Sequence, residues 1–108
     1  MESRKLKRGS YILVLAKDFS IARMHLLNMV HDMKHGDIKE IRNSSHELYV
    51  ELKNGDTYQA LCIAENLRGH RCDKIYVNAE IDFFTFIKII KPMLVMSQLP
   101  ENEQIVIY

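Results

Sequence analysis

Six consecutive apolar residues, from Tyr11 to Ala16, constrain the fold of this chain more than any other feature. The run has the length of a β-strand and contains no charged position, so other side chains must cover both of its faces. Such a strand is typical of the middle of a parallel sheet with helices on either side. Lys17 and Asp18 end the run, and we therefore expect a central strand at residues 11–16.

An amphipathic helix is expected directly after this strand, over residues 19–35. Its apolar positions recur three and four residues apart and so share one face: Phe19, Ala22, Leu26, Val30 and Met33. Asp18 or Ser20 can cap its start, and Gly36 is expected to end it. A strand, a short turn and a helix form the first half of a βαβ unit, which favours an α/β fold.

The pair Asn54-Gly55 marks a β-hairpin over residues 47–63. Before the pair, Leu48, Val50 and Leu52 alternate with polar or aromatic residues, and residues 57–63 are strand-like again. Both central residues of a type I′ turn need a positive φ, which Asn and Gly adopt readily. We therefore predict a two-residue turn in which Lys53 and Asp56 face each other as a cross-strand ion pair.

The remaining elements are a short edge strand within residues 37–45, strands at 74–79 and 104–108, and a helix at 82–97. The helix is apolar nearly all round, so it is either inserted into the core or covered by a partner. Pro92 is expected to kink or interrupt it. Its candidate interface residues are Phe83, Phe84, Phe86, Ile87 and Ile90.

Composition indicates one ordinary domain. Of the 108 residues, 47% are apolar and 27% are charged, and the net charge is +1, so no strong field attracts nucleic acid or membranes. We expect a single α/β domain at 10–108, preceded by a basic flexible lead-in at 1–9 that contains Arg4-Lys5-Leu6-Lys7-Arg8. The alternative for this lead-in is an arm that contacts phosphates.

No apolar run is long enough for a signal peptide or a membrane span, which predicts a cytoplasmic protein without membrane contact. Cys62 and Cys72 form no CxxC motif and fall in or beside predicted strands, so they are expected to be buried free thiols. His31 and His35 have the i, i+4 spacing of a helical zinc pair, but no third ligand accompanies them. We therefore expect surface histidines, no metal and no cofactor.

Two groups of residues are candidates for ligand contacts. Lys17 and Asp18 occupy the turn after the first strand, where backbone N–H groups can hold an anion although no GxxxxGK[ST] phosphate loop is present. The only internal cationic cluster consists of Arg68, His70, Arg71 and Lys74. These side chains are expected either to bind phosphate or to form ion pairs with Glu65, Asp73 and Glu80.

Several segments, taken in order, resemble part of the ATPase domain of large terminase subunits, the DNA-packaging motors of bacteriophages, and more loosely P-loop helicase cores. Residues 11–33 resemble the strand and helix that follow the Walker A unit, and 52–60 resemble the hairpin of that family. Residues 67–77, which begin Leu-Arg-Gly-His-Arg-Cys-Asp, resemble the segment that leads into its Walker B acidic pair. The resemblance covers residues 10–96 and implies a phage or prophage protein with a P-loop-NTPase-like fold.

The chain departs from that family at the residues that carry catalysis. It contains no Walker A sequence, and Asn78 and Ala79 stand where the family has a magnesium-binding Asp and a catalytic Glu. Glu80 is shifted by one residue, which turns a strand side chain to the other face. Phosphoryl transfer then lacks its phosphate cradle, its metal ligand and its base, so we expect no enzyme. Asn78 and Glu80 remain candidate binding residues.

We therefore expect a terminase-like half-core without the P-loop: a small, mostly parallel sheet with a hairpin. The first functional hypothesis is a non-catalytic phage or prophage module that binds proteins and forms a homodimer through the apolar helix or an uncovered sheet edge. The alternative is a small nucleic-acid-binding protein that uses the basic N-terminus with Arg68, Arg71 and Lys74. A residual nucleotide-binding enzyme is the third hypothesis.

Overall fold

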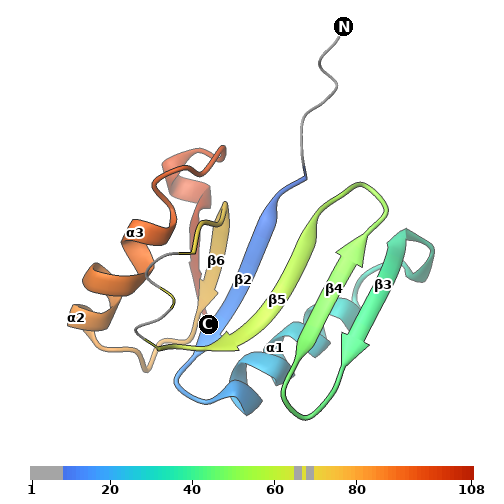
Figure 1. The fold of residues 1–108 in the computed structure, drawn as a ribbon, viewed down its shortest axis with the longest axis horizontal. Coiled ribbons are helices and arrows are strands. Elements are labelled where there is room, and N and C mark those ends of the chain that lie inside the picture. Colours follow the sequence, from blue (N-terminus) through green and yellow to red (C-terminus); the bar gives the residue numbers. More distant parts are fainter. Residues whose placement is uncertain (1–8, 65–66, 68–69) are drawn as a thin grey trace, which may run out of the picture.

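A six-stranded sheet forms the centre of the protein. The computed structural model describes residues 9–64, 67 and 70–108, and its strands lie in the order β3-β4-β5-β2-β6-β7 (Figure 1). Their bounds are Tyr11–Ala16 (β2), Ile38–Asn43 (β3), Leu48–Leu52 (β4), Thr57–Cys62 (β5), Lys74–Val77 (β6) and Ile105–Ile107 (β7). β5, β2, β6 and β7 are parallel, and β3, β4 and β5 form an antiparallel meander. The predicted α/β fold, with a mostly parallel sheet and a hairpin, is confirmed.

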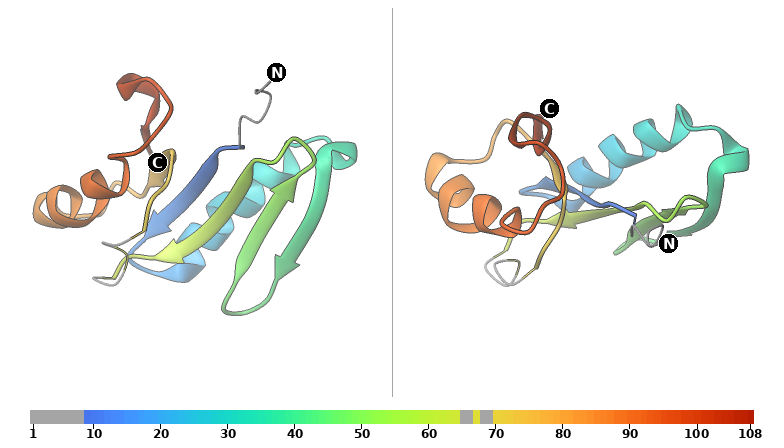
Figure 2. Two further views of the ribbon diagram at one scale, coloured as in Figure 1. Left: turned by 45° about the horizontal axis from the view of Figure 1, so that its top comes forward. Right: turned by 90° about the horizontal axis from the view of Figure 1, so that it is seen from above.

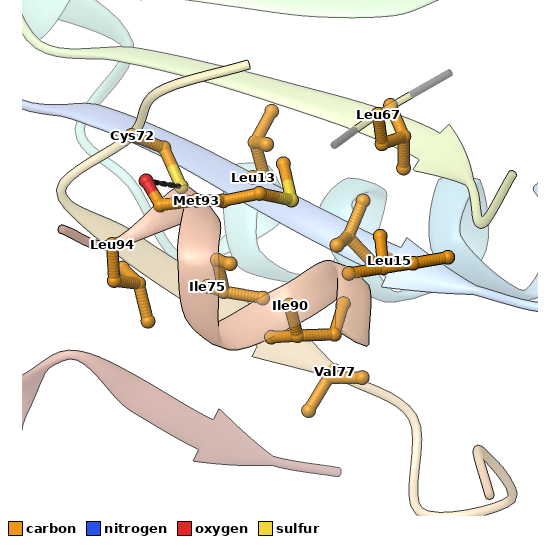
Figure 3. Packing of buried hydrophobic residues seen from close by; sticks show 10 residues of the cluster. Leu13, Leu15, Leu67, Cys72, Ile75, Val77, Ile90, Met93 and Leu94 are labelled. Atoms are coloured by element: carbon orange, nitrogen blue, oxygen red, sulfur yellow. Dashed lines mark hydrogen bonds between the residues drawn. The ribbon is translucent and has the colours of Figure 1, made fainter. Parts of the chain in front are cut away.

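β2 is the central strand that its apolar sequence predicts. Residues 12–16 are 4% exposed or less, because helices cover β2 on both faces. Val14 and Ala16 belong to the core under α1 (Phe19–His31). Leu13 and Leu15 point to the opposite face, where Figure 3 shows them packed with Ile75, Val77, Ile90 and Met93. Figures 1 and 2 show the corresponding layers, with α1 on one face of the sheet and the second helical segment on the other.

α1 is shorter than its predicted span. It ends at His31, and its apolar face buries Ala22 and Leu26 completely, as the spacing predicts. The backbone N–H of Asp32 donates to Met29 O (3.1 Å), a bond to the third residue back that tightens the last turn and ends the helix. A short 3-10 turn, η1 (His35–Asp37), follows, so His35 is not on α1 and the predicted i, i+4 histidine pair on one helix is wrong.

The hairpin is confirmed, but its turn differs from the prediction. Gly55 N–H donates to Leu52 O (3.0 Å), and Leu52 N–H donates to Asp56 O (2.9 Å), so the loop holds three residues instead of two. Gly55 has φ +98°, which matches a type I turn closed by a glycine bulge. Asp56 consequently lies opposite Leu52, and the predicted pair of Lys53 with Asp56 is wrong. The Asp56 carboxylate instead accepts a hydrogen bond from Ser10 N–H (2.8 Å).

The apolar helix is interrupted, and it ends earlier than predicted. It consists of α2 (Phe83–Thr85), a π-helical turn η3 (Phe86–Ile90) and α3 (Lys91–Met93), together called the helical segment 83–93. Lys91 N–H donates to Phe86 O, five residues back. Pro92 lacks an N–H and its ring clashes with the ordinary helical carbonyl partner, so the wider turn directly before it relieves that conflict.

Two predicted environments need correction. Ile90, a predicted interface residue, is fully buried in the chain's own core and is therefore unavailable to a partner. Cys62 lies at the end of β5 and is exposed, so only Cys72 is the buried thiol that we predicted. Cys72 Sγ lies 3.8 Å from Met93 O (Figure 3), and burial, followed by the charge of Asp73, raises the pKa of this thiol to about 12.

Candidate functional site

The carboxyl ends of the four parallel strands lie together at one end of the sheet, here called the carboxyl end. Asn78, directly after β6, donates its N–H to Leu15 O near the end of β2 (3.0 Å). Ile63, directly after β5, donates to Ala16 O (2.9 Å). In open α/β sheets ligands bind at the carboxyl end, because strand ends, loops and helix N-termini converge there. It brings Lys17 and Asp18 to the same side of the sheet as Asn78 and Glu80.

Asn78 is committed to the structure of the strand tip. Its Oδ1 accepts from Glu80 N–H (3.1 Å), which closes a side-chain turn, and its Nδ2 donates to Tyr108 O (3.5 Å). The neighbouring Ala79 N–H also donates to Tyr108 O (2.7 Å). The tip thus presents a neutral amide and a methyl group, while the Glu80 side chain is exposed to solvent.

Lys17 and Asp18 are exposed at the start of α1. Asp18 is the N-cap residue by position, but its side chain makes no capping hydrogen bond. Asp82, which sequence reasoning missed, does cap its helix: its Oδ1 accepts from Thr85 N–H (2.8 Å) and its Oδ2 from the Thr85 hydroxyl (2.9 Å). These bonds lower the pKa of Asp82, and the charge of Lys17 lowers it further. An Asp three residues before a Thr at the start of an apolar run was the available signal.

Tyr108, directly after β7, lies against α1 and the end of β2. Its ring stacks on His25 of α1, with centroids 3.8 Å apart and planes 3° apart, and its hydroxyl donates to Leu15 O (3.0 Å). Burial raises the pKa of Tyr108 to about 12 and lowers the pKa of His25. Nothing in the sequence pairs two aromatic side chains so far apart, so this contact was not predicted.

Of the predicted cationic cluster, His70 lies near the carboxyl ends of the strands, where it lines a hollow with Phe19 and Cys62. Arg68 is outside the described residues, as is the basic stretch 4–8. Lys74 begins β6 at the opposite end of the strand from Asn78, and its Nζ lies 5.2 Å from the centroid of the Tyr76 ring. Arg71 is exposed and donates to the carbonyl of the adjacent His70 (3.3 Å). The ion pairs with Glu65 and Glu80 and the phosphate contacts stay predictions.

Asp73 carries a further buried carboxylate, for which the sequence predicts only an ion-pair role. It is 1% exposed; its Oδ2 accepts from Tyr11 N–H (2.9 Å) and its Oδ1 from Gln98 N–H (3.2 Å). Its backbone carbonyl accepts from the Ser97 hydroxyl (2.6 Å). Asp73 therefore joins the start of β2, the start of β6 and the loop before β7. These lie at the end of the sheet opposite the carboxyl end.

Two limits on the chemistry follow from the described part of the chain. Within residues 9–64, 67 and 70–108, no three His, Cys, Asp or Glu side chains lie together as a metal-ligand set. None of the helices in these ranges has the length and apolar content that a membrane crossing requires.

Comparison with known proteins identifies a structural neighbour. No protein-family model and no curated protein matches this sequence. Among solved structures, the chain is similar to the ATPase domain of the large terminase of Thermus phage P74-26, with a TM-score of 0.65 and 15% identity over 94% of this chain. The chain spans 48% of the length of that structure. The resemblance is thereby confirmed at the level of the fold, which is terminase-like and P-loop-NTPase-like.

Proposed function

We propose that this chain is a non-catalytic protein-binding module of a bacteriophage or prophage, built on a terminase-like core and acting in the host cytoplasm. The exposed apolar surface of the helical segment 83–93 and β7 is the observation that carries the proposal. Phe83, Phe84 and Ile107 are 72%, 74% and 65% exposed. Large apolar side chains gathered on a small protein are typical of a surface that another protein covers, here including a second copy of the chain.

The strand tip supports the non-catalytic part of this proposal. A phosphoryl-transfer site needs carboxylates that hold magnesium ions and a base or an oriented water. Here the tip residues are Asn78, whose amide binds the backbone of Glu80 and Tyr108, and Ala79. A neutral amide and a methyl group supply neither the charge nor the proton acceptor.

Thermal melting with ATP and magnesium ions tests the absence of nucleotide binding. A ligand of the native state raises stability by about 2.7 kcal/mol at one hundred times its dissociation constant. We expect no change in melting temperature at millimolar nucleotide. A rise that Lys17→Ala abolishes would contradict the proposal, since it would place a phosphate site at the turn before α1.

Sedimentation of the double variant Phe83→Ser/Phe84→Ser tests the protein-binding surface. Both side chains are exposed, so the variant should fold as the wild type does, which circular dichroism checks. We expect wild-type self-association at tens of micromolar to weaken in this variant. If the wild type associates and the folded variant sediments in the same way, this surface has no role in the association.

Binding to nucleic acid is the second candidate, and the environment of Arg71 favours it. Its guanidinium is exposed and donates to a carbonyl oxygen, and it pairs with no carboxylate among the described residues. A gel-shift assay at low and moderate salt separates the two functions, because phosphate contacts weaken steeply with salt. We expect no shift at low salt; a shift that Arg71→Ala removes would favour this second function.

A further inference from the structure

β7 has an open backbone edge. Among the described strands it pairs with β6 alone. In a parallel pair, alternate residues direct both of their backbone groups to the same neighbour. Gln104 O accepts from Ile75 N–H (2.8 Å), and Tyr108 N–H donates back to β6, so the even-numbered residues face β6. The N–H and C=O groups of Ile105 and Ile107 therefore point away from the sheet.

Two hollows flank this edge on the face that the helical segment 83–93 covers. The first has a volume of about 410 Å³ and is lined by Ile107 with, among others, Val77, Ile81, Phe83 and Phe86. The second has a volume of about 440 Å³ and a mixed lining: Ile105, Phe86, Leu94 and Val95 are apolar, and Lys91, Glu101 and Gln104 are polar or charged. Ile105 and Ile107 lie two residues apart, so the hollows have the spacing of alternate side chains on an added strand.

The sequence of β7 fits the site that β7 helps to form. Ile105-Val106-Ile107 carries no charge and has the same order of residues in both directions. When a second β7 runs antiparallel to it, with the two Val106 residues opposite, each Ile105 lies opposite Ile107 of the other copy. These opposed residues are the ones with outward N–H and C=O groups, so they exchange hydrogen bonds as a ladder pair. Their side chains point to the same face and extend over the hollows of the other copy.

The exposed apolar area also fits a second copy better than a short peptide. The large exposed apolar side chains at this end are Phe83, Phe84, Ile87, Val95, Met96, Val106 and Ile107. Their combined exposed area is of the same order as the ~800 Å² that each partner buries in an interface of standard size. A peptide strand would fill the groove that the two hollows form along β7, and it would leave most of the exposed apolar side chains of the helical segment in water. A two-fold axis perpendicular to the sheet places both helical segments on the same face of the joined sheet.

We propose that the chain forms a symmetric dimer in which β7 pairs antiparallel with β7 of a second copy, joining the two sheets into one. This inference rests on the proposed protein-binding function and names the partner and its mode of docking. It places Val106 at the centre of the contact, with Ile105 and Ile107 on either side of it and Phe83 beside Ile107.

Sedimentation equilibrium of three matched variants tests the pairing. Ile107→Pro removes an outward N–H that β6 does not use, and edge strands tolerate proline at such positions. Ile107→Lys puts a charge into the groove, and Ile41→Lys makes the same change on the opposite edge strand, β3. We expect the two Ile107 variants to raise the dimer dissociation constant by on the order of tenfold or more, and Ile41→Lys to leave it unchanged.

The outcomes are separable from those of the proposed function. A wild type that stays monomeric at several hundred micromolar overturns the dimer, while the protein-binding function stands for another partner. Dimers that survive both Ile107 changes but dissociate in Phe83→Ser/Phe84→Ser overturn the strand pairing and keep the surface. Circular dichroism shows whether each variant is folded, and Ile107→Lys decides the question if Ile107→Pro does not fold.

Discussion

The two edges of this sheet are built in opposite ways. β3 has a register irregularity between Ile38 and Glu40 and carries charged side chains along its length. Lys39 Nζ lies 3.6 Å from Glu51 Oε2, and the Arg42 guanidinium carbon lies 4.2 Å from the centroid of the Tyr49 ring. β7 is short and entirely apolar, and it pairs with β6 without a register shift.

The sequence therefore protects one edge of the sheet, β3, and leaves the other, β7, without such protection. A bulge and charged side chains of both signs discourage another strand from pairing with β3, because docking there would remove these charges from water. β7 offers outward backbone groups beside two hollows and carries no charge. The same sheet thus has one edge protected from association and one edge suited to it, and four further experiments test that contrast.

The largest effect is expected from Asp73→Ala, which removes the carboxylate that anchors the loop before β7 to the start of β2. Tyr11 N–H and Gln98 N–H would then lose a buried acceptor, so we expect a loss of about 2–4 kcal/mol in the free energy of unfolding. Asp56→Ala, which removes the half-buried acceptor of Ser10 N–H on the β5 side, should cost only about 1 kcal/mol. Urea denaturation measures both, and equal losses would show that the two halves are anchored alike.

Glycine substitutions test the hairpin on the β3 side. A Cβ on Gly9 would lie 2.2 Å from the Gly55 backbone, and Gly55 has φ +98°, so alanine at either position should cost about 1–2 kcal/mol. Gly36→Ala is the matched control, because no atom lies within 4 Å of its added Cβ. Thermal melting should therefore separate the first two variants from the third. A Gly55→Ala variant as stable as Gly36→Ala would contradict the turn described here.

Alkaline pH should lower the free energy of unfolding, because of two groups buried near β6 and β7. Burial raises the pKa of Cys72 from 9.0 to about 12 and that of Tyr108 from 10.0 to about 12. The unfolded chain therefore loses these protons first, and the native state loses stability as the pH rises from about 9 towards 12. We expect the melting temperature to fall by roughly 5 °C per pH unit above pH 9, and less steeply in Cys72→Ala. The same slope in both proteins would exclude Cys72 as a cause.

The smallest effect on stability is expected at the charged edge. Lys39→Thr breaks an exposed ion pair and should change the free energy of unfolding by less than about 0.5 kcal/mol. Combined with Glu40→Thr and Arg42→Thr, it should nevertheless create new self-association through β3, visible in sedimentation of the Ile107→Lys background. If the uncharged β3 stays monomeric there, charge is not what protects this edge.

The elements with a clear period could be predicted from the sequence. The uninterrupted run at 11–16 gave the central strand, the three-and-four spacing gave α1, and alternation around Asn54-Gly55 gave the hairpin. The loop length could not be predicted, because Asn-Gly suits both the two-residue turn and the three-residue turn with a glycine bulge. The strand order could not be predicted either, since pairing of β5 with β2 depends on contacts across the sheet.

The surface of the helical segment was harder to predict for a physical reason. When nearly every position of a helix is apolar, the sequence has no period that separates the buried side from the exposed side. Ile90 and Phe84 look equivalent in the sequence, yet the first is buried and the second is 74% exposed. The two hollows along β7 form between segments that are distant in the chain, so no local pattern marks them.

The contact between Tyr108 and Leu15 has a consequence for how the chain folds. Its two residues lie 93 positions apart, and Asp73 reaches Tyr11 across 62 positions, whereas the β3–β4–β5 meander joins neighbours in the chain. Closing long loops costs entropy before any contact compensates it, so the meander can form early while β6 and β7 must add late. Until they do, one side of β2 stays open, and the slowest step of folding is expected to be the docking of β6, β7 and the helical segment 83–93 onto β2.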